Sequence, residues 1–350
     1  MAWLELVQII GVGERSYETM VRKQIIASND VDRQNEKIAD KVLVEIAEEI
    51  NRNESVMRMG LNHDVSIMPV GKVIKGTVVN IQDNTLGVEA QIDDFMCDFY
   101  KIIGPDKQIL YTASSSLDKR PFIEYEADAK EHITVLLSPL NFIDDEYEEL
   151  KHIINDECGS LVEDSIKKSF IPDPEIVVHL VIGTMVCLTA EKTVNKASEK
   201  LAEKISDDIV KVYDNLKKII VHIGKRIVGS KATTYVLTEP EQDIELVITT
   251  SNPEDVLNAI EIASDGYITS QTEKYRRYLD GTLKKIQFLY SVENQKWEVN
   301  YMVTNTGQVI GSEQNYRRAV KLYNTIMKTP GAGFSIGGTA TVEKNETGDA

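Results

Sequence analysis

The stretch IIASNDVDRQNEKIADKVLVEIAEEI, residues 25–50, contains the end of a strand, a turn and a helix that the sequence predicts. Residues 21–28 are rich in the β-branched side chains that strands favour, and the polar residues after them favour a turn. In residues 40–51 the apolar side chains recur at the spacing of one helix face; they are Val42, Leu43, Ile46, Ala47 and Ile50. This order predicts a domain in which strands are combined with few helices.

Further strand-like segments lie on both sides of this stretch. They occupy residues 4–12, 70–79, 86–92, 109–112 and 132–137. Between the second and third of them, Asp83 and Asn84 are typical turn residues. We therefore expect residues 1–143 to form one compact β-rich domain.

The second half of the chain changes in character near two prolines. Residues 144–173 are acidic and helix-prone, and we expect them to form a helical linker that ends at Pro172 and Pro174, because prolines at this spacing interrupt a helix. Apolar residues then recur at steps of three, four and seven between 194 and 223. This pattern predicts a long amphipathic helix, or two helices that break near Ser206 and Asp207.

A small α/β unit is expected to follow the amphipathic helix, so that residues 174–330 form a second domain. Its strand-like segments are residues 235–238, 244–250, 287–292 and 297–303, and its helical segments are residues 253–263 and 316–327. Residues 331–350 lack any periodicity, and we expect them to form a disordered tail. The fold class predicted for the whole chain is α+β.

Charge and cysteine content exclude several classes of protein. The 350 residues carry a net charge of −17, and residues 124–164 contain 13 acidic and 2 basic side chains. Such a chain is a poor general binder of nucleic acid, because phosphate contacts need clustered Lys and Arg. Three cysteines that lie far apart predict neither a disulfide framework nor a zinc site, so we expect a cytoplasmic protein without a metal.

The longest apolar run, residues 176–190, is fifteen residues long and includes a histidine and a glycine. A membrane-spanning helix needs about 20 apolar residues. We therefore expect the run to be buried in protein, although membrane association through residues 176–226 stays open as an alternative. The first residues carry no basic segment of the kind that begins a signal peptide.

Four motifs in the first half resemble the phage prohead serine proteases, which act in capsid maturation. They are VDR (31–33), NHD (62–64), PVGKV (69–73) and LGVEA (86–90), in the order and spacing of that family. The resemblance covers about residues 1–143. It implies a small β-barrel and a serine endopeptidase that acts on protein substrates without a cofactor.

The resemblance also implies which residues carry the reaction. His63 matches the histidine that acts as general base, which activates a serine hydroxyl by taking its proton. The family serine falls in ILYTASSSLDKRPF, residues 109–122, where Ser114 is the best candidate and Ser115 and Ser116 are close behind. His132, at the start of the next strand, is the candidate third member.

The same residues allow another interpretation. Three consecutive serines commonly form a turn, and a barrel can be kept while its chemistry is lost. The alternative is a non-catalytic protein-binding or assembly module, either phage-structural or related to phage defence. In both cases we expect a protein substrate or partner and a homo-oligomer. The sequence contains no phosphate-binding or HExxH motif, so nucleotide hydrolysis and zinc chemistry are not expected.

Overall fold

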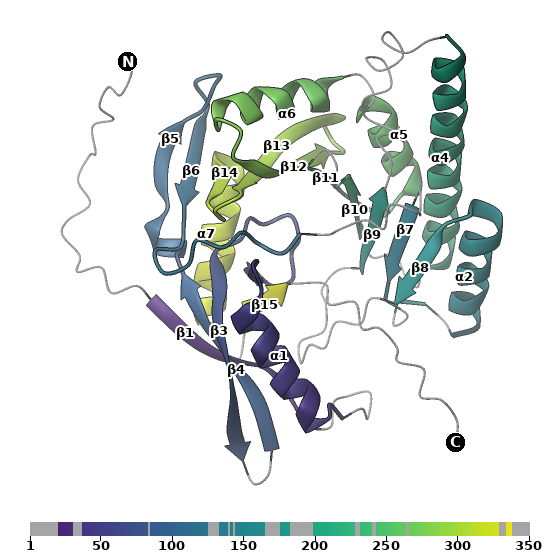
Figure 1. Cartoon of the computed structure of the whole chain (residues 1–350). Helices are drawn as coiled ribbons and strands as arrows, with labels where there is room; N and C mark the ends of the chain where they lie inside the picture. The colour runs from purple at the N-terminus through teal and green to yellow at the C-terminus, as the bar shows by residue number, and fades with distance from the viewer. Residues whose placement is uncertain are drawn as a thin grey trace.

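The computed structural model describes residues 20–30, 37–82, 85–124, 133–138, 141–142, 144–164, 176–182, 199–227, 232–239, 243–263, 266–328 and 334–337. Within these ranges, six α-helices accompany two β-sheets (Figure 1). The predicted α+β class is therefore confirmed.

The smaller sheet has five antiparallel strands in the order β1-β4-β3-β2-β15. Their bounds are β1 (Met20–Ser28), β2 (Arg58–Leu61), β3 (Gly71–Gln82), β4 (Thr85–Asp94) and β15 (Phe334–Gly337). Four of these strands come from the first hundred residues, and the fifth comes from near the end of the chain. A short 3-10 helix, η1 (Met96–Asp98), follows β4.

Helix α1 (Asp40–Arg52) lies against β3, and a glycine permits the close approach. A Cβ atom at Gly76 would lie 3.0 Å from Ile50 Cδ1 and 3.2 Å from Ala47 Cα. The Asn51 side chain closes the contact, since its amide donates to the Gly76 carbonyl (2.9 Å) and accepts from the Gly76 N–H (3.0 Å). The helix buries Leu43, Ala47 and Ile50, which belong to the apolar face predicted from the sequence.

The larger sheet has ten strands in the order β5-β6-β14-β13-β12-β11-β10-β9-β7-β8. Their bounds are β5 (Tyr100–Ile103), β6 (Ile109–Ala113), β7 (Ile133–Leu137), β8 (Leu161–Asp164), β9 (Ile176–Ile182), β10 (Thr233–Glu239), β11 (Ile244–Thr250), β12 (Leu283–Ser291), β13 (Lys296–Thr304) and β14 (Val309–Ser312). The sheet is mixed, because β7/β8, β9/β10 and β11/β12 pair in parallel and the other neighbours pair antiparallel.

The remaining helices are α2 (Asp144–Cys158), α4 (Glu199–Arg226), α5 (Pro253–Ala263), α6 (Tyr267–Tyr278) and α7 (Glu313–Lys328). Figure 1 shows α2, α4 and α5 grouped beside the β7–β10 half of the larger sheet. One apolar core lies there: Leu150 of α2, Leu216 of α4 and Ile260 of α5 pack with the sheet residues Leu180 and Ile248. The expected amphipathic helix is thus one continuous helix over residues 199–226.

A second apolar core joins the two sheets. It contains Met59 and Val73 from the smaller sheet together with Tyr301 and Val309 from the larger one, and α7 adds Ala319. All five side chains are at most 1% exposed. The two sheets therefore share one packed interior at this end of the molecule.

The sheets do not follow the boundaries that the sequence suggested. Strands β5, β6 and β7 come from residues 1–143 but belong to the ten-stranded sheet. Segment 144–173 was expected to be a linker, yet Tyr147 and Leu150 of α2 are buried in the first core. Among the described strands no closed barrel is found, so the barrel stays a prediction.

Two local expectations have clear outcomes. Residues 334–337 were expected in a disordered tail but form β15, which pairs with β2. The apolar run after residue 176 begins as β9, between β10 and β7, and the side chains of residues 176–181 are buried or half-buried, as expected; residues 183–190 lie outside the described ranges. In the described parts of the chain, no helix is both long and apolar enough to cross a membrane.

Candidate functional site

The three serines of the predicted nucleophile run follow the end of β6, and their exposure differs. Ser114 and Ser116 are exposed, whereas Ser115 is fully buried. The Ser115 hydroxyl donates to Oδ2 of Asp93, and it accepts from the backbone N–H groups of Leu117 (3.2 Å) and Asp118 (2.9 Å). A hydroxyl has one donor and two acceptor positions. All three are used here, so Ser115 fixes the turn.

Lys72 of β3, from the PVGKV motif, is a second buried polar residue that binds this turn. Its ammonium donates to the carbonyl oxygens of Asp118 (3.0 Å), Arg120 and Thr306 (3.3 Å), which uses all three of its N–H bonds. Burial lowers the pKa of Lys72 to about 8. Lys72 thus connects β3, the turn after β6 and the β13–β14 turn.

Arg120 extends the same connection to α1. Its guanidinium pairs with Asp118 (2.6 Å) and donates to the carbonyl oxygens of Ile50 (3.1 Å), Asn53 (3.0 Å) and Ile74 (3.1 Å). The carbonyls of the last turn of a helix lack intrahelical partners, and Arg120 satisfies one of them, that of Ile50. Burial opposes ionisation of Asp118, but the hydrogen bonds from Arg120 lower its pKa overall.

One carboxylate oxygen in this region is without a hydrogen bond. Oδ1 of Asp93 is buried and has no partner among the described residues. Nearby, burial raises the pKa of Asp98, and the carboxylates of Asp93 and Asp94 raise it further. Asp94 is paired with Arg22 (2.5 Å) and accepts from the hydroxyl of Tyr323 (2.8 Å).

The predicted base, His63, lies in a tight turn after β2. Asn62 and His63 have φ values of 52° and 57°, in the left-handed region. His63 is half-buried. The turn continues into Asp64, whose Oδ1 accepts from the backbone N–H of Ser66 (2.9 Å) and from its hydroxyl (2.6 Å). Arg318 of α7 then donates to the Ser66 hydroxyl (2.8 Å), so the histidine turn is held against α7.

The predicted triad of His63, Ser114 and His132 stays a prediction. His132 lies outside the described residues. Ser114 is accessible, while the hydroxyl of its neighbour Ser115 is fully occupied by Asp93 and two backbone groups. Of the three serines, the structure therefore leaves Ser114 and Ser116 as the accessible candidates for a nucleophile.

A chain of buried amides, which was not predicted from the sequence, also fixes the histidine turn. Asn315 of α7 donates to the Ser66 carbonyl (2.7 Å) and to Asn300 Oδ1 (2.7 Å), and it accepts from the Met68 N–H (3.1 Å). Asn300 donates in turn to Gln287 Oε1 (2.5 Å). These amides are far apart in sequence and share no motif, so only the fold brings them together.

A buried group of charges lies next to the amides. Lys285 of β12 pairs with Glu124 (2.8 Å) and lies 3.7 Å from Glu245 of β11. Burial lowers the pKa of Lys285, but the two carboxylates outweigh it and raise the pKa overall. For Glu245 the balance is the reverse: burial raises its pKa, while Lys285 and Arg58 bring it below the ordinary value. The group therefore stays charged, and its members compensate one another.

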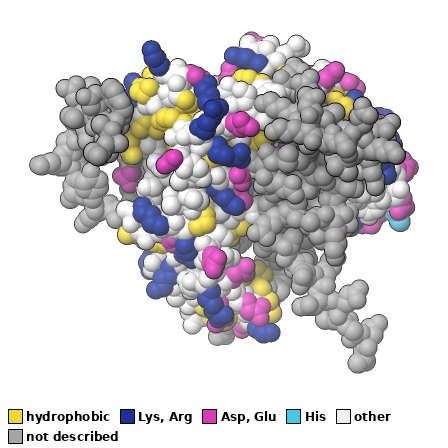
Figure 2. Space-filling view, turned by 45° about the horizontal axis from the view of Figure 1, so that its top comes forward, with side chains coloured by type: hydrophobic (Ala, Val, Ile, Leu, Met, Phe, Trp, Pro, Cys, Tyr) yellow, Lys and Arg dark blue, Asp and Glu magenta, His cyan; other side chains and the backbone are white. Residues whose placement is uncertain are grey.

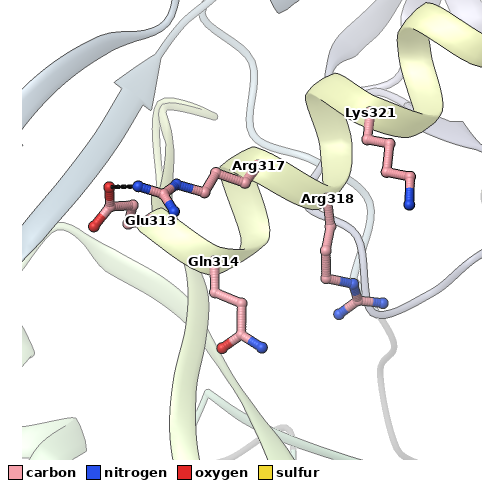
Figure 3. A pocket seen from close by; sticks show the side chains of 5 residues that line it. All are labelled: Glu313, Gln314, Arg317, Arg318 and Lys321. Carbon is pink, nitrogen blue, oxygen red and sulfur yellow. Dashed lines mark hydrogen bonds and ion pairs between the residues drawn. The ribbon is translucent and has the colours of Figure 1, made fainter.

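A groove of about 360 Å³ lies along α7, next to the histidine turn. It is lined by Glu313, Gln314, Arg317, Arg318 and Lys321. Figure 3 shows the side chains of Gln314, Arg318 and Lys321 pointing to the same side of the helix, as their spacing of four and three residues requires. Arg317 is instead turned toward Glu313, with which it pairs at 2.6 Å.

The groove is locally basic on an acidic protein. Arg318 and Lys321 bring two positive charges to it, and Glu313 is neutralised by Arg317. Arg318 also pairs with Asp64 of the histidine turn (3.3 Å), so Lys321 carries the charge that remains. Figure 2 shows Lys and Arg side chains in a broken band down one face, with acidic side chains beside them. Within the described residues, no group of three or more His, Cys, Asp or Glu is placed to hold a metal ion.

Comparisons of the chain with protein-family models, with curated proteins and with solved structures found no match. The resemblance to prohead proteases therefore rests on the quoted motifs of residues 31–90 and on the serine run that follows them.

Proposed function

We propose that the chain is a non-catalytic protein-binding module, and that the α7 groove receives an acidic segment of its partner. The observation that carries the proposal is the groove itself, where Arg318 and Lys321 project to one side beside Gln314. Opposite charges across an interface speed association and select the partner. If the resemblance to prohead proteases reflects descent, the partner is a phage structural protein.

The rigidity of the groove supports a binding role. Arg318 is held by Asp64 (3.3 Å) and by the Ser66 hydroxyl (2.8 Å), and α7 is fixed by Asn315, which is fully buried. A binding residue that is already in position loses less conformational entropy when the partner arrives. Lys321 is exposed and adds a positive charge to the α7 groove.

A protein partner fits the groove better than a nucleic acid. Nucleic-acid binding draws its affinity from many phosphate contacts. This groove offers only Lys321 and an Arg318 that is already paired with Asp64 (3.3 Å), on a chain of net charge −17. The surrounding surface would repel an extended polyanion, but a short acidic segment of a protein can reach the groove alone.

Serine endopeptidase activity is the second candidate. The specific observation in its favour is the exposure of Ser114, which follows β6 at the place that the family resemblance gives to the nucleophile. The hydrogen bonds around Ser114 argue against it. The side chains of Ser115, Lys72 and Arg120 donate to carbonyl or carboxylate groups that hold the turn in the fold.

The test is binding of a fluorescein-labelled decaglutamate peptide, measured by fluorescence anisotropy. We expect saturable binding that weakens as the salt concentration rises from about 50 to about 500 mM, because screening shortens the range of charge interactions. Lys321→Glu should weaken binding by about tenfold or more. Lys328→Glu is the matched control, since it makes the same charge change at the exposed end of α7 and should have little effect.

Three results would overturn the proposal. The first is the absence of peptide binding at low salt, and the second is an equal loss in the Lys321→Glu and Lys328→Glu variants. The third is tighter binding of a single-stranded oligonucleotide of the same length, which would indicate a nucleic-acid site instead.

A further inference from the structure

A second and larger groove lies on another part of the surface, between the β5–β6 turn, α6 and β13. Its volume is about 620 Å³, which falls in the range of small-molecule sites. Its lining includes Gln108, Leu110, Tyr267, Gln271, Tyr275 and Trp297. They come from three segments that are far apart in the sequence.

The floor of this groove is apolar and aromatic. Leu110 and Trp297 are 1% and 3% exposed, and Ile109, Ile262 and Val299 complete the lining. The indole N–H of Trp297 donates to the carbonyl of Ala259 (2.9 Å). Because this polar group is satisfied inside the protein, the small part of the indole that borders the groove is apolar.

Every charged side chain that lines the groove is already paired. Asp106 pairs with Lys274, Lys296 pairs with Glu298 (2.5 Å), and Glu313 pairs with Arg317 (2.6 Å). A charged ligand would gain no unpaired counter-ion there and would lose its own hydration, which is costly in a partly apolar site. The lining therefore favours a neutral occupant.

Two polar side chains remain available for hydrogen bonds. Among the described residues, neither the Tyr267 hydroxyl nor the Gln271 amide forms a hydrogen bond, while Gln108 already donates to the Tyr275 hydroxyl. Tyr267 and Gln271 lie one turn apart on α6, and both line the groove. Together they offer donors and acceptors at its edge.

We propose that this groove binds a small neutral molecule that carries an aromatic ring and hydrogen-bonding groups. The ring packs on the half-buried apolar side chains of Ile109, Ile262 and Val299, next to Trp297, and its polar edge is bound by Gln271 and Tyr267. This inference does not depend on the acidic-partner groove of α7, although Glu313 borders both grooves.

The chain provides its own reporter for the test. It contains two tryptophans, Trp3 and Trp297, so a Trp3→Phe variant isolates the fluorescence of the groove residue. The neutral probes are adenosine, nicotinamide and indole. Adenosine monophosphate and nicotinate are their charged counterparts of nearly the same shape. A peptide, Ala-Trp-Ala with blocked ends, tests whether the groove takes a protein side chain instead.

We expect at least one neutral probe to change the Trp297 fluorescence saturably, and its charged counterpart to bind about tenfold more weakly or not at all. Gln271→Phe should fill the groove and lower the affinity about tenfold. Ser270→Phe is the matched control, because it adds the same ring at an exposed neighbouring position of α6. Circular dichroism checks that both variants fold.

Four results would overturn the proposal. They are no saturable response to any neutral probe, equal binding of the charged counterparts, equal effects of the two phenylalanine variants, and tighter binding of the blocked peptide than of every small probe. The last of these would identify the groove as a peptide-binding surface. None of them bears on the decaglutamate experiment, so the two proposals can fail separately.

Discussion

The hydroxyl of Ser115 donates a hydrogen bond to Oδ2 of Asp93, a residue of β4 that lies 22 positions earlier in the chain. Both side chains are fully buried. This bond joins the turn after β6, which belongs to the ten-stranded sheet, to the last part of a strand in the five-stranded sheet. The central serine of the predicted nucleophile run is thus a structural link between the two sheets.

Replacement of Ser115 by Ala should destabilise the fold. It would leave the Asp93 carboxylate buried without any hydrogen bond within the described residues, and it would free the N–H groups of Leu117 and Asp118. We expect a loss of about 3 kcal/mol in the free energy of unfolding, measured with urea. Ser116→Ala, at an exposed position, should change it by less than about 0.5 kcal/mol. Equal losses in the two variants would contradict the structural role.

Lys72 should make stability depend on pH in the alkaline range. Its pKa is about 8 in the folded chain, lowered by burial from the ordinary 10.5. Between these values the unfolded chain binds more protons than the folded one, so stability rises with pH there. Compared with Lys72→Met, the wild type should gain about 1–2 kcal/mol between about pH 8 and pH 9.5.

The comparison with Lys72→Met cancels the contribution of other groups. Burial raises the pKa of Tyr235 and of Tyr275 to about 12, so these tyrosines lose protons first in the unfolded chain and reduce stability above about pH 10. Urea unfolding at each pH provides the measurement. Parallel curves for the two proteins would show that Lys72 does not titrate as described.

Asn315 should hold the histidine turn in place. Asn315→Ala removes the bonds to the Ser66 carbonyl, to Asn300 and to the Met68 N–H, all of them buried. We expect a destabilisation of about 2–4 kcal/mol. Amide hydrogen exchange of residues 61–68 should accelerate more than that of α1. Uniform acceleration in both segments would mean that the amide chain does not act locally on this turn.

The expected homo-oligomer can be tested through charge. Helix α2 exposes five carboxylates, Asp145, Glu148, Glu149, Asp156 and Glu157, which a basic groove on a second copy can contact. We expect sedimentation velocity to detect self-association at about 50 mM salt that is lost at about 500 mM. Lys321→Glu should abolish it at low salt. A monomer under both conditions would contradict the expectation.

Several elements could be predicted from the sequence because their signals are local. The apolar spacing of residues 40–51 located α1, and residues 253–263 and 244–250 match α5 and β11 at both ends. At α5, Asn252 accepts from the N–H of Glu254 (3.2 Å), as expected of a capping residue. Helix α6 was missed, because its sequence YITSQTEKYRRY is polar and its buried residues are few.

The arrangement of the sheets could not be predicted in the same way. Nothing local in residues 100–113 indicates that β6 pairs with β14, nearly two hundred positions later. The same holds for the candidate site: the three serines indicated a turn, but the partners that fix this turn and the histidine turn are Asp93, Arg318 and Asn315. These partners are brought near only by long-range pairing.

The most direct test of the non-catalytic proposal is labelling of the purified protein with a fluorophosphonate probe, which reacts with activated serines, followed by mass spectrometry of the modified peptide. The proposal predicts no labelling above that of the Ser114→Ala and His63→Ala variants. Labelling of Ser114 or Ser116 that disappears in His63→Ala would contradict it and would establish an activated serine.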